Sequence, residues 1–298
     1  MKKIMLRRLY WTPVLICSLS IHLSAQSNSG SNSVLDAFAK AAAANPNDSS
    51  GADLTMKALN MLTGGVSVFA EDSAAAIGSF KKSSGGSGMH YEYSMMMTGK
   101  NSTTKDSSNL FFTDGGEGRL EMKIPIPGVQ MKRTVSLGHF DQPKFTVLLY
   151  PESKTYLLRI IDPSMMSAGQ TYQVTKIGTE TVLGYSCIHS KLVSTVGSGR
   201  FKSTSTIEIW TSTAVPGYSL YKKMSSMQTS QMAMFKALEN AGASGIFVKM
   251  MVAGKDYSYE QNLIKAEESK FSADLFRIPS GYTQSNGNVI SNMMPSAK

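Results

Sequence analysis

Residues 174–193 read VTKIGTETVLGYSCIHSKLV, and residues 205–218 read STIEIWTSTAVPGY. In both stretches β-branched and aromatic residues alternate with polar ones, which is typical of strands with one buried face. Gly184 interrupts the first stretch and predicts a turn there. We therefore predict two exposed-edge strands of one antiparallel sheet, which also carries Cys187.

The same period of two recurs towards the N-terminus of the chain. In residues 89–97, Met and Tyr alternate with His, Glu and Ser, and residues 119–126 alternate in the same way. Residues 144–150 and 154–161 are less polar on their second face and flank a Pro-Glu-Ser turn, which predicts two central strands covered on both sides. Further strands are expected at residues 172–177, 185–196, 200–211, 246–252 and 256–265, with turns at Gly178, Gly184 and residues 197–199.

One helix is predicted over residues 226–241, where Met and other apolar residues are dense, and Gly242 ends it. Strands precede and follow this helix. The order predicts a mainly β protein with minor α structure, in which a large antiparallel meander has a helix packed on one face.

The N-terminus has the pattern of a secretory signal. Lys2, Lys3, Arg7 and Arg8 precede an apolar run over residues 9–23, and small residues end at Ala25. A membrane anchor is the alternative, but Pro13 and the polar residues of the run leave less than the ~20 apolar residues that span a bilayer. Lipid attachment at Cys17 is disfavoured because Ile16 stands where a small residue is needed. We expect cleavage after Ala25, no transmembrane segment afterwards, and a periplasmic or secreted protein.

Removal of this signal changes the charge of the chain. Four of its 30 basic residues lie in the signal, which leaves 26 against 21 acidic residues and a net charge of +5 instead of +9. The remaining Lys and Arg are scattered and form no stripe that could follow a phosphate backbone. Nucleic acid is therefore not expected as a partner.

The chain divides into four parts on composition. A signal at residues 1–25 is followed by a flexible leader over residues 26–88, rich in Ser, Asn, Ala and Gly. Short helices are expected there at residues 34–44 and 53–62, and a flexible run at residues 83–88. A β-rich domain at residues 89–282 and a polar tail at residues 283–298 complete the chain.

Several segments together resemble a known family. They are FTVLLYPESKTYLLRI from Phe145, the stretch from Val174, IEIWTS before Pro216-Gly217-Tyr218, and FRIPSGY from Phe276. Their order resembles the exported bacterial domains called domain of unknown function 4412 (DUF4412), and the likeness covers residues 89–282. Such domains are similar in layout to the lipoprotein-carrier (LolA-like) fold. The resemblance implies a strongly curved antiparallel sheet or incomplete barrel around an apolar groove; it implies no reaction, and it leaves the leader unexplained.

Residues that could carry chemistry are few. Cys187 and His189 lie two apart on one strand, about 7 Å along it, and no further Cys or His stands at metal-ligand spacing. A reactive or metal-binding thiol is the alternative to a half-buried packing thiol, which the pattern favours. Glu117, Glu121, Glu180 and Glu208 lie on separate segments and are interpreted as solvated surface charges. We predict no catalytic residue, no metal ligand and no cofactor.

Methionine is the unusual feature of the composition, with 20 residues. Clustered thioethers can fill a core, line an adaptable apolar groove, or bind Cu(I). We take the groove as the candidate site and place it between the helix and the strand of residues 89–97. Its ligand-binding residues would be Met224, Met227, Met234, Phe235, Leu238, Tyr91, Tyr93 and Met95.

The sequence favours an exported, non-enzymatic binding module. Its methionine-rich apolar groove would hold an apolar small molecule, such as a lipid-like ligand, or a hydrophobic segment of a partner protein. Two alternatives stay open from the sequence: an exported hydrolase with an unrecognised site, and a structural or adhesive envelope protein.

Overall fold

The computed structural model describes residues 76–99, 103–123, 132–139, 145–160, 170–196, 203–225, 229–253 and 257–285. The expected signal, the leader helices at residues 34–44 and 53–62, and most of the expected tail lie outside the described residues. Each helix in the described part is too short or too polar to cross a bilayer.

In the described part of the chain, twelve strands form one sheet in the order β12-β6-β5-β4-β3-β2-β1-β11-β10-β9-β8-β7. All neighbours are antiparallel except the short parallel pair of β12 with β6. The strands β1–β6 and β7–β11 each lie side by side in chain order, with two helices between β9 and β10 in the chain, and β1 pairs with β11 to join the two runs. The strands are β1 (Gly86–Gly99), β2 (Thr103–Thr113), β3 (Glu117–Met122), β4 (Thr134–His139), β5 (Phe145–Tyr150), β6 (Thr155–Ile160), β7 (Gln170–Val182), β8 (Tyr185–Val196), β9 (Ser203–Ser212), β10 (Ile246–Ala253), β11 (Tyr257–Phe271) and β12 (Thr283–Gln284).

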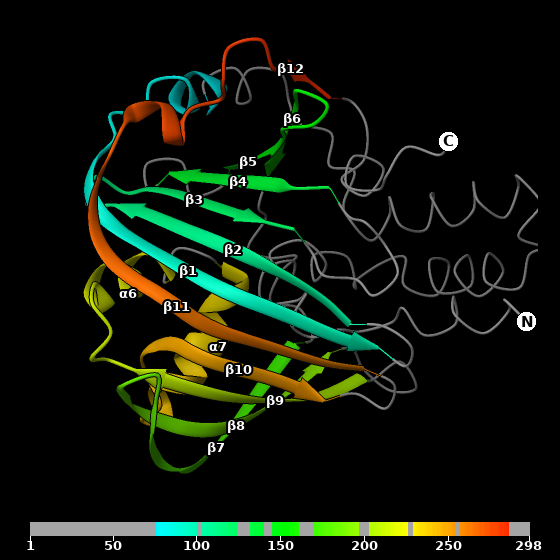
Figure 1. Cartoon of the computed structure of the whole chain (residues 1–298), viewed down its shortest axis with the longest axis vertical. Helices are drawn as coiled ribbons and strands as arrows, with labels where there is room; N and C mark the ends of the chain where they lie inside the picture. Colours follow the sequence, from blue (N-terminus) through cyan, green and yellow to red (C-terminus); the bar gives the residue numbers. More distant parts are fainter. Residues whose placement is uncertain are drawn as a thin grey trace, which may run out of the picture.

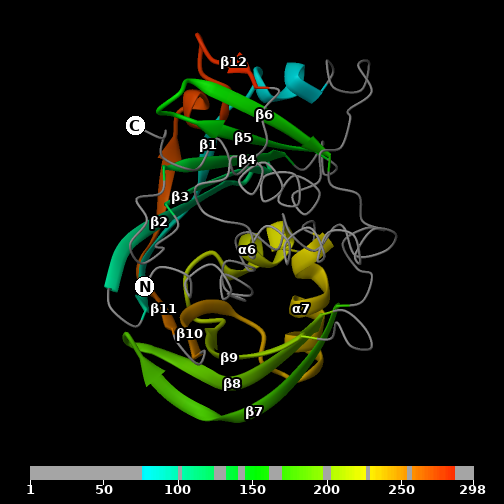
Figure 2. The same cartoon turned by 90° about the vertical axis from the view of Figure 1, so that its right-hand side faces the viewer.

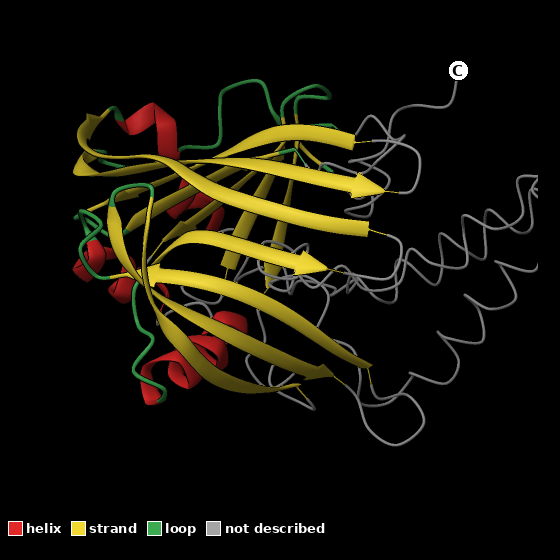
Figure 3. Cartoon of the chain, turned by 60° about the horizontal axis from the view of Figure 1, so that its bottom comes forward, coloured by secondary structure: helices red, strands yellow, loops and turns green. Residues whose placement is uncertain are grey.

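The sheet is strongly curved and does not close into a barrel (Figures 1 and 2). Two helices, α6 (Tyr218–Ser225) and α7 (Thr229–Asn240), lie on its concave side (Figure 2). Strands make up most of the described chain, as the colouring in Figure 3 shows. The predicted fold class, a curved antiparallel sheet with helical cover on one face, is confirmed.

Strand β1 shows why the alternating pattern predicted the sheet correctly. Its odd-numbered residues from Met89 to Met97 are all buried, with exposed fractions of 0–7%. These side chains point to the concave face, because they join two hydrophobic clusters that also contain Met234 of α7 and Tyr221 of α6. The even-numbered residues are partly exposed on the other face. The strand therefore has one face in the core, as period two predicts.

Strand β5 is covered on both faces, as expected. Leu148 and Tyr150 belong to the cluster under α7, whereas Val147 and Leu149 pack with Phe80 on the opposite face. The predicted central position is wrong, because β5 and β6 lie near the β12 end of the sheet. The residues that cover the second face of β5 come from distant segments of the chain. Because this cover requires apolar residues on both faces, a strand near the end of the sheet has the same sequence pattern as a central strand.

One turn assignment and one edge assignment also need correction. Gly178 lies within β7 beside a register shift and is part of a bulge, so it is not a turn. Strand β7 is an edge of the sheet, but β9 lies between β8 and β10 and is not. Gly184, with φ of 83°, does form the predicted turn between β7 and β8.

The segment before β1 is anchored, so the expected flexible run at residues 83–88 is wrong. Ser83 is buried, and residues 86–88 already belong to β1. Buried Glu117 accepts hydrogen bonds from Ser83 Oγ at 2.6 Å, from Ser84 N at 2.7 Å and from Gly85 N at 3.0 Å. Arg277 donates two hydrogen bonds to the carbonyl of Ser83. Glu117 is thus an internal anchor and not the solvated charge that the sequence indicated.

The expected tail also starts later than residue 283. Strand β12, at Thr283–Gln284, pairs with β6, and Ser285 N donates to the carbonyl of Tyr156 at 2.7 Å. Before β12 in the chain, the short 3-10 helix η4 (Ala273–Phe276) buries Phe276. The folded domain therefore extends at both ends beyond residues 89–282.

Candidate functional site

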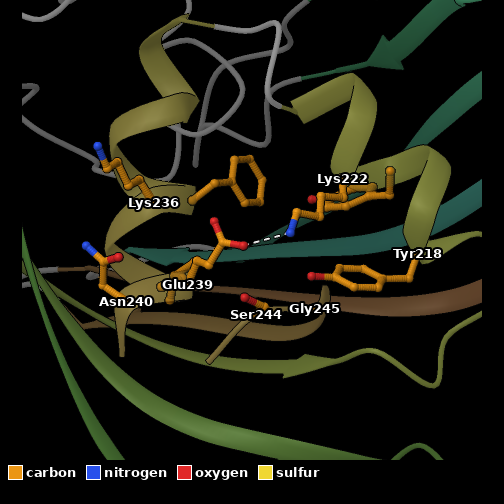
Figure 4. A pocket seen from close by; sticks show the side chains of 10 residues that line it. Tyr218, Lys222, Lys236, Glu239, Asn240, Ser244 and Gly245 are labelled. Atoms are coloured by element: carbon orange, nitrogen blue, oxygen red, sulfur yellow. Dashed lines mark hydrogen bonds and ion pairs between the residues drawn. The ribbon is translucent and has the colours of Figure 1, made fainter. Parts of the chain in front are cut away.

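A pocket opens between α6 and α7, with a volume of about 260 Å³ (Figure 4). Its walls come from both helices and from the turn before β10. The lining residues are Tyr218, Tyr221, Lys222, Phe235, Lys236, Leu238, Glu239, Asn240, Ser244 and Gly245. Aromatic and aliphatic side chains form its inner part, and charged and amide groups form its rim.

Helix α6 is held against β1 by the residues just before it. The Tyr91 hydroxyl donates to the carbonyl of Pro216 at 3.0 Å. Gly217 has φ of 77°, and a Cβ added there would lie 2.3 Å from Met89 Cγ and 2.5 Å from Tyr91 Oη. A glycine is required because the backbone crosses directly over two core side chains in a left-handed conformation. The Pro-Gly pair therefore sets where α6 starts above the sheet.

The end of α7 and the start of β10 form the opposite wall. Ala243 N donates to the carbonyl of Leu238 at 2.8 Å and Gly242 N to that of Glu239 at 2.9 Å, which is a Schellman cap with Gly242 at φ of 65°. The Thr211 hydroxyl then binds the carbonyl of Ala243 at 2.8 Å. These bonds fix the turn that carries Ser244 and Gly245 into the pocket wall.

The floor of the pocket is continuous with the core. Tyr221 and Phe235 meet edge to face with ring centroids 5.8 Å apart, and Phe235 stacks on Phe247 at 5.8 Å. Tyr221 also contacts Tyr91 at 6.0 Å. Burial raises the pKa of Tyr91, so its hydroxyl keeps its proton and acts as a donor. An apolar ligand in the pocket would therefore rest on aromatic rings that the sheet holds in place.

An ion pair spans the rim of the pocket. Lys222 Nζ of α6 lies 2.7 Å from Glu239 Oε1 of α7, and Figure 4 shows the two side chains pointing toward one another. The hydrogen bond with Glu239 raises the pKa of the Lys222 ammonium, and the same contact lowers the pKa of the Glu239 carboxyl. Both side chains are more than half exposed, so the pair contributes little to stability.

The model of domain of unknown function (DUF4412) matches residues 91–282, which is most of the chain. The protein belongs to this family. The resemblance seen in the sequence is thereby confirmed. No curated protein matches the sequence.

The DUF4412 chain is similar to several solved structures, but its sequence identity to them is low. The MucA/MucB complex of Pseudomonas aeruginosa is 10% identical, with a TM-score of 0.32, and the likeness covers 71% of this chain and 59% of that one. Lipoprotein LppX of Mycobacterium tuberculosis is 15% identical, with a TM-score of 0.26, and coverage of 59% and 85%. The LolA superfamily protein NE2245 of Nitrosomonas europaea is 6% identical, with a TM-score of 0.27, and coverage of 70% and 98%. At these scores the likenesses carry no functional argument.

The structure of the DUF4412 domain divides the ligand-binding residues expected from the sequence. Phe235 and Leu238 line the pocket. Met227 lies outside the described residues, and Met224 belongs to α6 with its side chain undescribed. The others, Tyr91, Tyr93, Met95 and Met234, are 0–4% exposed and pack in the core clusters. These four positions, three on β1 and one on α7, therefore belong to the core and do not line the pocket.

No helix was predicted from the sequence at residues 218–225, and the α6 wall was therefore missed. The predicted single helix at residues 226–241 is in fact α7, with α6 as a separate helix before it. Tyr218, Tyr221 and Lys222 stand at i, i+3 and i+4, which places them on one face of a helix. That spacing was the available signal for these three pocket residues.

The Cys187 and His189 pair of the DUF4412 domain has no catalytic geometry. Both ring nitrogens of His189 face carboxylates, Nδ1 to Glu180 at 3.0 Å and Nε2 to Glu208 at 3.3 Å. Its ring stacks on Trp210 with centroids 4.1 Å apart. Cys187 Sγ instead points to the carbonyl of Tyr185 at 3.4 Å. Among the described residues, no group of three His, Cys, Asp or Glu could hold a metal ion.

We expect Cys187 to react slowly with a thiol-specific reagent. The side chain is fully buried, and burial raises the pKa of its thiol, so little reactive thiolate is present at neutral pH. The measurement is the labelling rate of a Cys17→Ser variant, in which Cys187 is the only thiol, in buffer and in denaturant. Slow labelling in buffer and fast labelling in denaturant are expected. Labelling of the native protein as fast as a free thiol would contradict the burial of Cys187, and only faster labelling would show an activated thiol.

Proposed function

We propose that the DUF4412 chain is an exported, non-enzymatic binding module. Its site is the pocket between α6 and α7, which takes an apolar small molecule or a hydrophobic segment of a partner protein. The observation that carries this proposal is an open pocket whose inner wall is aromatic and whose rim is polar. Export rests on the pattern of residues 1–25, and N-terminal sequencing of the processed chain, expected to start at Gln26, tests it.

The charges of the pocket favour binding over catalysis. Lys222 with a raised pKa stays protonated and is not a nucleophile, and Glu239 with a lowered pKa is a weak base. A nucleophilic amine at Lys222 or a general base at Glu239 would need the opposite shifts of pKa. The pair therefore supports a role in positioning a ligand and not in transferring a proton.

The methionines enter this proposal as adaptable core packing behind the pocket lining. Met234 and Met95 pack in the cluster that contains Leu238, whose side chain lines the pocket. Unbranched thioether side chains repack at low cost. The pocket volume of about 260 Å³ is just below the ~300–1,000 Å³ of ordinary small-molecule sites. Methionines packed behind Leu238 would let the pocket widen around a ligand.

Binding of a neutral apolar dye, N-phenyl-1-naphthylamine, tests the proposed site. We expect one saturable binding event, and we expect Ser244→Phe, which fills the pocket from the β10 side, to weaken it by about tenfold or more. Ser258→Phe adds the same side chain at an exposed position of β11 and is the control. Dye affinity that is absent in the wild type, or equal in the two variants, would remove the pocket as the site.

A further inference from the structure

The rim of the pocket has an unusual arrangement of charge. Lys222 and Lys236 are both on the rim, and Glu239 is the one carboxylate among the lining residues. Tyr218 and Ser244 add hydroxyl groups and Asn240 an amide. Most of these groups can donate hydrogen bonds, whereas Glu239 can only accept. The lining therefore suits an anion better than a cation.

Glu239 itself shows where that anion would bind. It lies in the last turn of α7, where the helix dipole disfavours negative charge, and α7 has no basic residue in its last turn. The cation that lowers its pKa is Lys222, on the other helix. The carboxylate of Glu239 thus occupies a position next to the Lys222 ammonium that the carboxylate of a ligand could take. Its side chain is 55% exposed, so it can return to water when displaced.

We propose that the pocket binds a single-chain amphiphile with a carboxylate head, and that Lys222 recognises this head in exchange for Glu239. The hydrocarbon chain would lie on Tyr221, Phe235 and Leu238, the apolar part of the lining. No covalent bond changes in this exchange, and one carboxylate replaces another at the same ammonium. The inference rests on the proposed function, because it concerns the same pocket.

Three amphiphiles with the same ten-carbon chain test the proposal: decanoate, decanol and decyltrimethylammonium, each used below its aggregation concentration. The readout is displacement of the neutral dye from the full chain. Wild-type protein is expected to bind decanoate about tenfold more tightly than decanol, because only the carboxylate head can replace Glu239 in a charge-assisted hydrogen bond with Lys222. The ammonium amphiphile is expected to bind most weakly.

Variants at the rim identify the group responsible. Lys222→Met keeps the apolar stem and should reduce decanoate affinity about tenfold while leaving decanol unchanged. Glu239→Gln removes the internal competitor and should increase decanoate affinity. Lys223→Met is the matched control, since Lys223 neighbours Lys222 on α6 but does not line the pocket. Thermal melts of the variants check that each is folded.

The outcomes separate this inference from the proposed function. Equal binding of decanoate and decanol, unchanged by Lys222→Met, would overturn the carboxylate head and leave the apolar pocket standing. Preference for the ammonium amphiphile, lost in Glu239→Gln, would overturn it in favour of a cationic head. Failure of the dye and all three amphiphiles to bind the folded wild type would overturn both proposals.

Discussion

Gly217→Ala is expected to lower the free energy of unfolding by about 3 kcal/mol. Two costs add up here: an L-residue in the left-handed region costs roughly 1–2 kcal/mol, and overpacking a core costs typically 1–3 kcal/mol. The new Cβ would lie 2.3 Å from Met89 Cγ and 2.5 Å from Tyr91 Oη, so β1 or α6 must move. Because the Tyr91 hydroxyl holds the chain at Pro216, dye binding should weaken as well.

Urea denaturation of Gly217→Ala and Gly242→Ala separates the two costs. Gly242 also has positive φ, at 65°, but a Cβ there would meet nothing within 4 Å. We expect Gly242→Ala to cost only the backbone strain, about 1 kcal/mol. Equal losses of stability in the two variants would show that α6 is not packed against β1 at this point.

Glu117→Gln is expected to destabilise the domain by about 2 kcal/mol, since an unsatisfied buried polar group costs ~1–3 kcal/mol. Glu117 is 3% exposed, and its two carboxylate oxygens accept from the Ser83 hydroxyl and from the amides of Ser84 and Gly85. A Gln side chain keeps one acceptor, but its amide nitrogen would face an N–H donor. The substitution leaves shape nearly unchanged, so the loss reports on the hydrogen bonds.

Amide hydrogen exchange gives the sharper measurement for this variant. Protection of the Ser84 and Gly85 amides should fall in Glu117→Gln by more than the global loss of stability explains. Glu268→Gln, at an exposed position of β11, is the control and should change neither quantity. Unchanged protection at Ser84 and Gly85 would mean that other contacts, such as those of Arg277 with Ser83, hold this segment.

The sequence predicted the strands whose two faces differ most. The alternation from Met89 to Met97 identified β1, and β8 was predicted with its observed ends. Strand β2 was missed because its first half, TTKDSS, is polar throughout and only its last residues are apolar. Such a strand forms because β1 offers it a pairing partner along eleven residue pairs, which is tertiary and not local information.

The site was predictable only on the α7 side. Phe235 and Leu238 were found from apolar density on the predicted helix, whereas Tyr218 and Lys222 lie on α6, which was not predicted. Sheet residues such as Tyr91 and Met95 were placed in the groove because a buried face and a ligand-lining face have the same pattern. Glu117 could not have been recognised, because its partners Ser83 and Ser84 lie 33–34 residues earlier in an apparently loose segment.

The pairing of β1 with β11 decides when the sheet can be completed as the chain folds. Tyr91 lies opposite Ala266, so β1, the first strand of the sheet in the chain, pairs with β11, which is almost the last. Until residues 257–271 emerge, β1 and β10 both have an open edge, and open edges are templates for pairing with other chains. A single fifteen-residue strand closes both at once. A chain that ended before β11 would therefore keep the open edges of β1 and β10, which can pair with other chains. Loss of β12 would remove only the short strand at one end of the sheet.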